Sequence, residues 1–106
     1  MTANLFRVTP WEMPSPPTEI LLLRIMREQG LNPYSWSNSP YDIYSDHKYN
    51  YDKVIYVVSG SITFGLLLQK KQITLNPGDR LDLLAGTVHN AHVGPNGVVC
   101  LEGHKE

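Results

Sequence analysis

Short alternating runs of apolar and polar residues dominate the chain from Tyr41 onward. The run 53–58 is β-branched and aromatic, which is typical of a strand, and Ser59-Gly60 follows it as a predicted hairpin turn. At Asn76-Pro77-Gly78 proline fixes φ and glycine permits a positive φ, so a second turn is predicted. Several short strands separated by regular turns predict an all-β sandwich or barrel. The predicted strands are 53–58, 61–68, 72–75, 80–83, 87–93 and 98–102, with further turns at 85–86 and 94–97.

The first forty residues differ, because six of the eight prolines fall there and break the chain into short pieces. One helix is predicted at 16–29, with Ser15 as N-cap, proline in the first turn and Gly30 as the stop. We expect its apolar face to cover the barrel or, alternatively, a partner subunit. The predicted organisation is an N-terminal extension at 1–40, with this short helix packing on the barrel, and a barrel at 41–106. The apolar face consists of Leu21, Leu22, Ile25 and Met26.

Composition and charge narrow the class of protein. A chain of 106 residues, 42% hydrophobic and 18% charged, suits one folded domain. A net charge of −1 gives no electrostatic footprint for nucleic acid, and no apolar run approaches the ~20 residues of a membrane span. The single cysteine, Cys100, cannot form an internal disulfide, and the first residues lack a secretory pattern. We therefore expect a cytoplasmic protein without nucleic-acid or membrane partners.

The segment 76–89 is the most informative part of the chain. It consists of a turn, an alternating strand at 80–83, a second turn at Gly86 and a histidine, His89, three residues later. This order can deliver one imidazole into the interior of a small barrel. The segment therefore predicts a fold and one wall of a site.

These residues resemble the second motif of the cupins, small β-barrels of the double-stranded β-helix (jelly-roll-like) type. The resemblance covers roughly half of the chain, from position 47 to position 93, and implies a compact single-domain, RmlC-like member. The motif reads G-x5-P-x-G-x2-H-x3-N, and this chain matches it with Gly78, Gly86 and His89, while Leu84 and Val93 replace the proline and the asparagine.

The first cupin motif, G-x5-H-x-H-x3-4-E-x6-G, is matched less fully. His47 and Gly60 fit its first histidine and last glycine. Tyr41, Tyr49 and Lys53 stand where the family has glycine, histidine and glutamate. The first motif has therefore lost a histidine and its carboxylate.

The resemblance implies a metal site, because cupins that hold a metal use two histidines and a glutamate of the first motif and one histidine of the second. The implied ligands here are His47 and His89, with the phenol of Tyr49 as a third, and the implied ion is divalent Zn, Fe, Mn or Ni. Lys53 would place an ammonium within ~4–6 Å of that ion and repel it. The predicted metal site is therefore degenerate and holds an ion weakly.

Side-chain parity places His47, Tyr49, Tyr51 and Lys53 on one face of a strand. Lys53 and Tyr51 are therefore predicted to contact a bound small molecule. A desolvated lysine can bind an anion or form a Schiff base. The alternative for Lys53 is an interior ion pair with a carboxylate such as Glu102.

Other reactive residues are predicted to have structural roles. His92 lies three residues after His89, on the opposite strand face unless a bulge intervenes. His104 is expected to face solvent near the C-terminus, and Cys100 to be a buried strand residue. The tyrosines and Trp36 are expected to pack in the core and at the barrel rim, or alternatively to line a pocket mouth.

Three classes of function remain open at this level, since one fold hosts many functions. The first expectation is a small-molecule-binding cupin with a weakly held divalent metal. The alternative is a metal-dependent small-molecule enzyme of the dioxygenase or isomerase type. A structural role through pairing of edge strands is the third class, and a homodimer is expected in any case.

Overall fold

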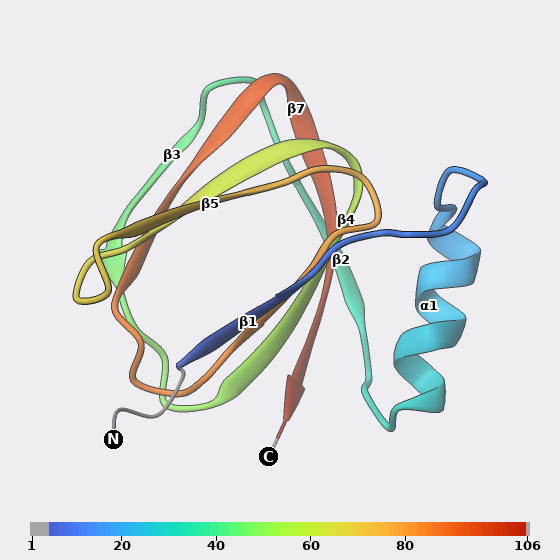
Figure 1. Ribbon diagram of the computed structural model, residues 1–106, viewed down its shortest axis with the longest axis horizontal. Helices are drawn as coiled ribbons and strands as arrows, with labels where there is room; N and C mark the ends of the chain where they lie inside the picture. Colours follow the sequence, from blue (N-terminus) through green and yellow to red (C-terminus); the bar gives the residue numbers. More distant parts are fainter. Residues whose placement is uncertain (1–4, 106) are drawn as a thin grey trace.

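Two long strands, β4 (Asp52–Leu66) and β7 (His89–Lys105), form the frame of the molecule in a computed structural model that describes residues 5–105. They pair antiparallel along their whole length, from Asp52 opposite Lys105 to Leu66 opposite His89. Figure 1 shows both strands curving, so that the sheet wraps around an interior. The remaining strands are β1 (Phe6–Thr9), β2 (Tyr34–Asn38), β3 (Ile43–His47), β5 (Lys71–Leu75) and β6 (Arg80–Leu83).

The short strands join the two halves of this frame differently. In one half the strand order is β1-β6-β4-β7-β2, and in the other β5 pairs with β4 while β3 pairs with β7. All of these pairings are antiparallel. The inner faces of the two halves enclose the core, and the predicted all-β barrel is confirmed.

Both long strands change register near one glycine each. The sequence predicted a hairpin turn at Ser59-Gly60 and another turn at 94–97, and both predictions were wrong, because β4 and β7 continue through these positions. Gly60 and Gly97 have φ of 75° each, which is the left-handed conformation that glycine adopts at little cost. A Cβ on Gly60 would also overlap the carbonyl oxygen of Gly97. The two glycines therefore make bulges that bend paired strands rather than ending them.

The interior of the barrel is filled by alternate residues of the strands, as a period of two requires. Residues 55, 57, 62, 64 and 66 of β4 are buried there, and residues 91, 93, 98 and 100 of β7 face them. The predicted burial of Cys100 is confirmed, and burial raises the pKa of its thiol to about 12. The inner cluster comprises Ile55, Val57, Ile62, Phe64, Leu66, Leu75, Leu81, Leu83, Ala91, Val93, Val98 and Cys100.

The single helix, α1 (Glu19–Glu28), covers the outer face of the barrel and not its interior (Figure 1). It begins later than predicted, because Thr18 rather than Ser15 caps it, with the Thr18 hydroxyl accepting from the Leu21 N–H at 3.2 Å. The Pro16-Pro17 pair precedes the helix, since a residue before proline is disfavoured in the helical region. Gly30 has φ of 81° directly after the cap, as predicted. The packing residues are Leu22, Met26 and Leu31 on the helix side and Val54, Tyr56 and Leu101 on the sheet.

The first forty residues contribute more than the predicted helix. Strand β1 pairs with β6, and strand β2 pairs with β7 from Tyr34 opposite Glu102 to Asn38 opposite Val98. Positions 1–4 of the predicted extension and position 106 lie outside the described residues. Within residues 5–105 no helix is long and apolar enough to cross a membrane.

Candidate functional site

A cavity of about 190 Å³ lies between the two halves of the barrel. Aromatic side chains from β2, β3, β4 and the segment between β3 and β4 form much of its wall, and its imidazole and charged groups come from β3, β4 and β7. The lining residues are Tyr34, Trp36, Tyr44, His47, Tyr49, Tyr51, Lys53, Ile55, Ile62, Phe64, His89, Ala91 and Glu102.

A buried ion pair spans two neighbouring strands at this cavity. Lys53 on β4 lies opposite His104 on β7, so Glu102 is its diagonal neighbour on the same face. The Lys53 Nζ is 4.0 Å from Glu102 Oε1, and each residue is only 6% exposed. The interior pair that the sequence suggested for Lys53 is therefore present.

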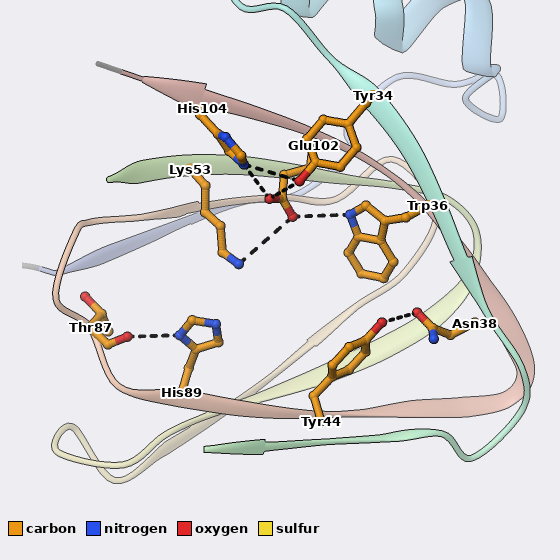
Figure 2. Close-up of polar contacts among 9 residues, drawn as sticks. All are labelled: Tyr34, Trp36, Asn38, Tyr44, Lys53, Thr87, His89, Glu102 and His104. Atoms are coloured by element: carbon orange, nitrogen blue, oxygen red, sulfur yellow. Dashed lines mark hydrogen bonds and ion pairs between the residues drawn. The ribbon is translucent and has the colours of Figure 1, made fainter. Parts of the chain in front are cut away.

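Glu102 is the centre of a wider hydrogen-bond network (Figure 2). Its Oε2 accepts from the Tyr34 hydroxyl at 2.7 Å and from His104 Nε2 at 2.7 Å. Its Oε1 accepts from the Trp36 indole N–H at 3.2 Å. With Lys53 nearby, the network holds a negative charge in an otherwise aromatic wall.

The two partners have pKa values shifted by the same environment. Burial alone would raise the pKa of Glu102, but the Lys53 cation and the hydrogen bonds from Tyr34 and His104 outweigh it, and the net pKa is lowered. For Lys53 burial dominates and lowers the pKa, with Glu102 acting in the opposite direction. Glu102 is therefore ionised at neutral pH, while the ammonium of Lys53 is only partly compensated.

His89 presents an unpartnered nitrogen to the cavity. Its Nδ1 donates to the carbonyl oxygen of Thr87 at 2.9 Å, because a carbonyl oxygen can only accept. This leaves the Nε2 with a lone pair, and that atom is buried without a hydrogen-bond partner among the described residues. Figure 2 shows the Nε2 directed away from Thr87 into the space beside Lys53 and Tyr44. Burial lowers the pKa of His89 to about 4, so the ring is neutral at physiological pH.

His47 is arranged in the same way. The bulge after Tyr44 on β3 places His47 opposite His89, with ring centroids 4.3 Å apart. Its Nδ1 lies 2.6 Å from the carbonyl oxygen of Ser45, which fixes the proton on that nitrogen. In both imidazoles the Nδ1 is thus held by a backbone carbonyl oxygen.

Two tyrosines complete the wall between the histidines and Lys53. The Lys53 Nζ lies 4.1 Å from the centroid of the Tyr49 ring, a cation–π contact. Tyr49 also packs edge-on against His47 at 5.1 Å and beside Tyr51 at 5.2 Å. The aromatic wall therefore stabilises the Lys53 cation and provides faces on which a planar ligand could stack.

The structure brings the five predicted site residues, His47, Tyr49, Tyr51, Lys53 and His89, to one cavity. Their roles in binding a metal or a ligand stay predictions. His92 is exposed on the opposite face of β7, as its parity indicated.

His104 is exposed, as expected from its place near the C-terminus. It also lies within β7, donates to Glu102 and packs against Tyr51 with ring centroids 4.1 Å apart. Tyr34 and Trp36 line the cavity, which agrees with the alternative of an aromatic pocket mouth rather than with core and rim packing. The alternation of Tyr34, Trp36 and Asn38 along a strand is the signal that could have placed both aromatic rings on the inner face.

These residues fit a divalent metal poorly. Within residues 5–105 no group of three or more His, Cys, Asp or Glu side chains is placed to hold an ion. His47 and His89 offer two imidazole nitrogens, whereas stable sites usually have three protein ligands. The carboxylate that lines this cavity, Glu102, is occupied by its network, and Lys53 adds a positive charge to the same cavity. The arrangement suits a ligand with a hydrogen-bond donor and an acceptor better than a cation.

Comparisons with known proteins identify the fold. Neither the protein-family models nor the curated proteins gave a match to the sequence. Among solved structures, a cupin superfamily protein from Desulfitobacterium hafniense matches with a TM-score of 0.61 at 14% identity, over 98% of this chain and 80% of that one. An RmlC-like cupin from Shewanella frigidimarina matches with a TM-score of 0.60 at 19% identity, over 70% of this chain and 64% of that one. The chain therefore has the fold of the small cupins.

A third match is to an enzyme. The polyketide cyclase RemF from Streptomyces resistomycificus has a TM-score of 0.63 at 23% identity, and the match covers 72% of this chain and 55% of the cyclase. At these identities the likeness establishes the fold and leaves the activity open.

Proposed function

We propose that this barrel binds a small, ring-sized molecule that has one hydrogen-bond donor and one acceptor or negative charge. The observation that carries the proposal is the His89 Nε2, a buried acceptor at the wall of the cavity that has no partner within residues 5–105. Leaving a buried polar group unsatisfied costs about 1–3 kcal/mol. A ligand that donates a hydrogen bond to this nitrogen recovers that free energy.

The size of the cavity supports a single ring. An apolar cavity of ~150 Å³ can hold benzene. The 190 Å³ here leaves room for one or two polar substituents on such a ring. Phe64 and the tyrosines of the wall supply apolar faces for it.

Charge supports an acceptor at the other end of the ligand. The Lys53 ammonium is buried, and its nearest carboxylate oxygen is 4.0 Å away, which is longer than a hydrogen bond. A carboxylate or carbonyl oxygen of the ligand can therefore accept from Lys53, with Tyr51 beside it. Lys53 and Tyr51 are the proposed ligand contacts at this end.

Calorimetric titration with 4-hydroxybenzoate, benzoate and phenol tests the proposal. We expect 4-hydroxybenzoate to bind about three- to tenfold more tightly than benzoate, which corresponds to one hydrogen bond. His89→Phe keeps an aromatic ring but removes the acceptor, and should abolish this preference. His92→Phe, on the opposite face of the same strand, should retain it. An unchanged preference in His89→Phe, or no binding of any probe at millimolar concentration, would overturn the proposal.

A metal-dependent enzyme of the dioxygenase or isomerase type is the second candidate. It is favoured by one observation, the carbonyl oxygens that hold the Nδ1 atoms of His47 and His89, an arrangement common behind metal-binding histidines. Dialysis after loading with Zn²⁺, Fe²⁺, Mn²⁺ or Ni²⁺ tests this candidate. Stoichiometric metal that disappears in the His47→Ala/His89→Ala double variant would support it, with Tyr49 as the third proposed ligand.

We also propose that the protein is a cytoplasmic homodimer. Ile43 on β3 is 80% exposed, and this strand has β7 as its only partner within the described residues, so its other edge is open to pairing. Sedimentation velocity at micromolar concentration tests the dimer, and a persistent monomer would contradict it.

A further inference from the structure

The amine of Lys53 lies at the cavity wall, and no acceptor within residues 5–105 is at hydrogen-bond distance from it. Its nearest acidic atom is Glu102 Oε1 at 4.0 Å, and that oxygen already accepts from the Trp36 indole. The other oxygen of Glu102 is taken by Tyr34 and His104. Figure 2 shows the Lys53 chain extended toward the interior of the barrel, with Nζ near its centre.

Arg80 shows what a structural cation looks like in the same chain. Its Nε and Nη2 donate to the two oxygens of Asp82 at 2.8 and 2.9 Å, so that the guanidinium is locked by two hydrogen bonds. Lys53 is more deeply buried and has no such partner. The Tyr49 ring at 4.1 Å and Glu102 favour the ammonium form of Lys53, but burial outweighs Glu102 and lowers the pKa. Desolvation of this kind activates a lysine amine as a nucleophile.

We propose that Lys53 captures small aldehydes or ketones as an imine, so that the cavity binds carbonyl compounds covalently and reversibly. The inference rests on the proposed binding function, because the ring and the donor group of the ligand are those already assigned to the aromatic wall and His89. It adds that the acceptor of the ligand is a carbonyl group.

The chemistry balances without a co-reactant. The neutral amine attacks the carbonyl carbon, a C–N bond forms, and the carbonyl π electrons move to oxygen, which takes up a proton. The resulting carbinolamine loses its hydroxyl as water and leaves a C=N bond. Taken from the ammonium form, two of its three protons leave in the water and the third stays on the protonated imine. The positive charge beside Glu102 is therefore preserved, and the buried pair is not broken.

The direct test uses 4-hydroxybenzaldehyde with sodium borohydride on the full chain, followed by peptide mass mapping. The hydroxyl can donate to His89 Nε2 while the aldehyde reaches Lys53. We expect a reduced adduct at Lys53 at least ~10-fold above that at any exposed lysine, as the activated amine requires. The exposed lysines that serve as internal controls are Lys48, Lys70, Lys71 and Lys105. Lys53→Arg keeps the charge and should lose the adduct, whereas Lys48→Arg should keep it.

The proposal is overturned if all lysines of the wild-type protein are labelled equally. It is also overturned if Lys53→Arg carries as much adduct as the wild type, at another position. The wild-type map decides the matter even if the variant fails to fold. A second titration with 4-hydroxybenzyl alcohol, which has no carbonyl group, separates the two proposals. If the alcohol binds but the aldehyde leaves no adduct at Lys53, the imine is refuted and the binding function stands. If neither compound binds, both are refuted.

Discussion

Replacing Glu102 with glutamine should show how much the buried Lys53–Glu102 pair contributes to the stability of the barrel. The substitution preserves the shape of the side chain and leaves one carbonyl oxygen, which can still accept from either Tyr34 or Trp36 but not from both, since they donate to different oxygens of Glu102. It removes the negative charge beside Lys53, whose side chain remains buried. The main effect is therefore an uncompensated interior cation.

The magnitude follows from the geometry. Two unit charges at the observed 4.0 Å interact by about 4 kcal/mol at an effective dielectric constant of 20. Removing one member of a buried pair typically costs about 3–5 kcal/mol. Because the hydrogen bonds are partly retained, we expect Glu102→Gln to lower the free energy of unfolding by about 3 kcal/mol. Lowering Tm by about 10–20 °C would correspond to this loss in a domain of this size.

Urea denaturation followed by tryptophan fluorescence measures the effect, because Trp36 contacts Glu102 directly. The Lys53→Met/Glu102→Gln double variant should recover about 2 kcal/mol of the loss, since it removes the stranded charge. Glu28→Gln on the exposed face of α1 should stay within about 0.5 kcal/mol of wild type. The reasoning is refuted if Glu102→Gln has the same urea midpoint as the wild type. It is also refuted if the double variant loses as much free energy of unfolding as the two single variants lose together.

Three further predictions concern other groups. Burial lowers the pKa of His89 from 6.5 to about 4, so on acidification the unfolded chain binds the proton before the folded chain does. The free energy of unfolding should therefore fall by about 3 kcal/mol between pH 6.5 and 4. Urea midpoints should fall across this pH range in the wild type, and His89→Phe should remove this fall. Tyr41 has φ of 65°, which strains a residue with a Cβ, and its side chain is 69% exposed. Tyr41→Gly should therefore raise the free energy of unfolding by about 1 kcal/mol, whereas Tyr41→Ala should not. Equal denaturation midpoints for the two variants would contradict this. Lys53→Glu removes a cation and adds a carboxylate beside the two histidines, so calorimetry should give at least ~10-fold tighter Zn²⁺ binding than wild type, and unchanged affinity would place Lys53 outside the site.

The grouping of much of this site was predicted correctly, though not for the reason given. His47, Tyr49, Tyr51 and Lys53 line one cavity. They do not alternate along one strand, because β3 ends at His47 and β4 begins at Asp52. Tyr41 supports the alignment with the first cupin motif, because it keeps a positive φ at the position where the family has glycine. The cupin motifs also have glycine at positions 60, 78 and 86, and all three glycines have positive φ.

Cross-strand register made the rest unpredictable. A glycine with positive φ serves a hairpin turn or a bulge equally well, so Gly60 and Gly97 could not reveal that their strands continue. The network of Glu102 depends on the pairing of β2 with β7, which brings Tyr34 and Trp36 to Glu102 across 68 and 66 residues of sequence. The strand pairing of residues 6–9 and 34–38 likewise depends on distant partners that no local pattern specifies.

Strand β7 has a consequence for the order of events during synthesis, because it follows every other strand of the barrel and supplies both His89 and Glu102. Until β7 emerges from the ribosome, β2, β3 and most of β4 lack their main partner, and Lys53 can remain hydrated. Closing such long-range pairings is slow compared with local structure. We therefore expect the nascent chain to complete its cavity and to bury Lys53 and Glu102 only when β7 pairs with β4, whereas the pairings of β4 with β5 and β6 can form earlier.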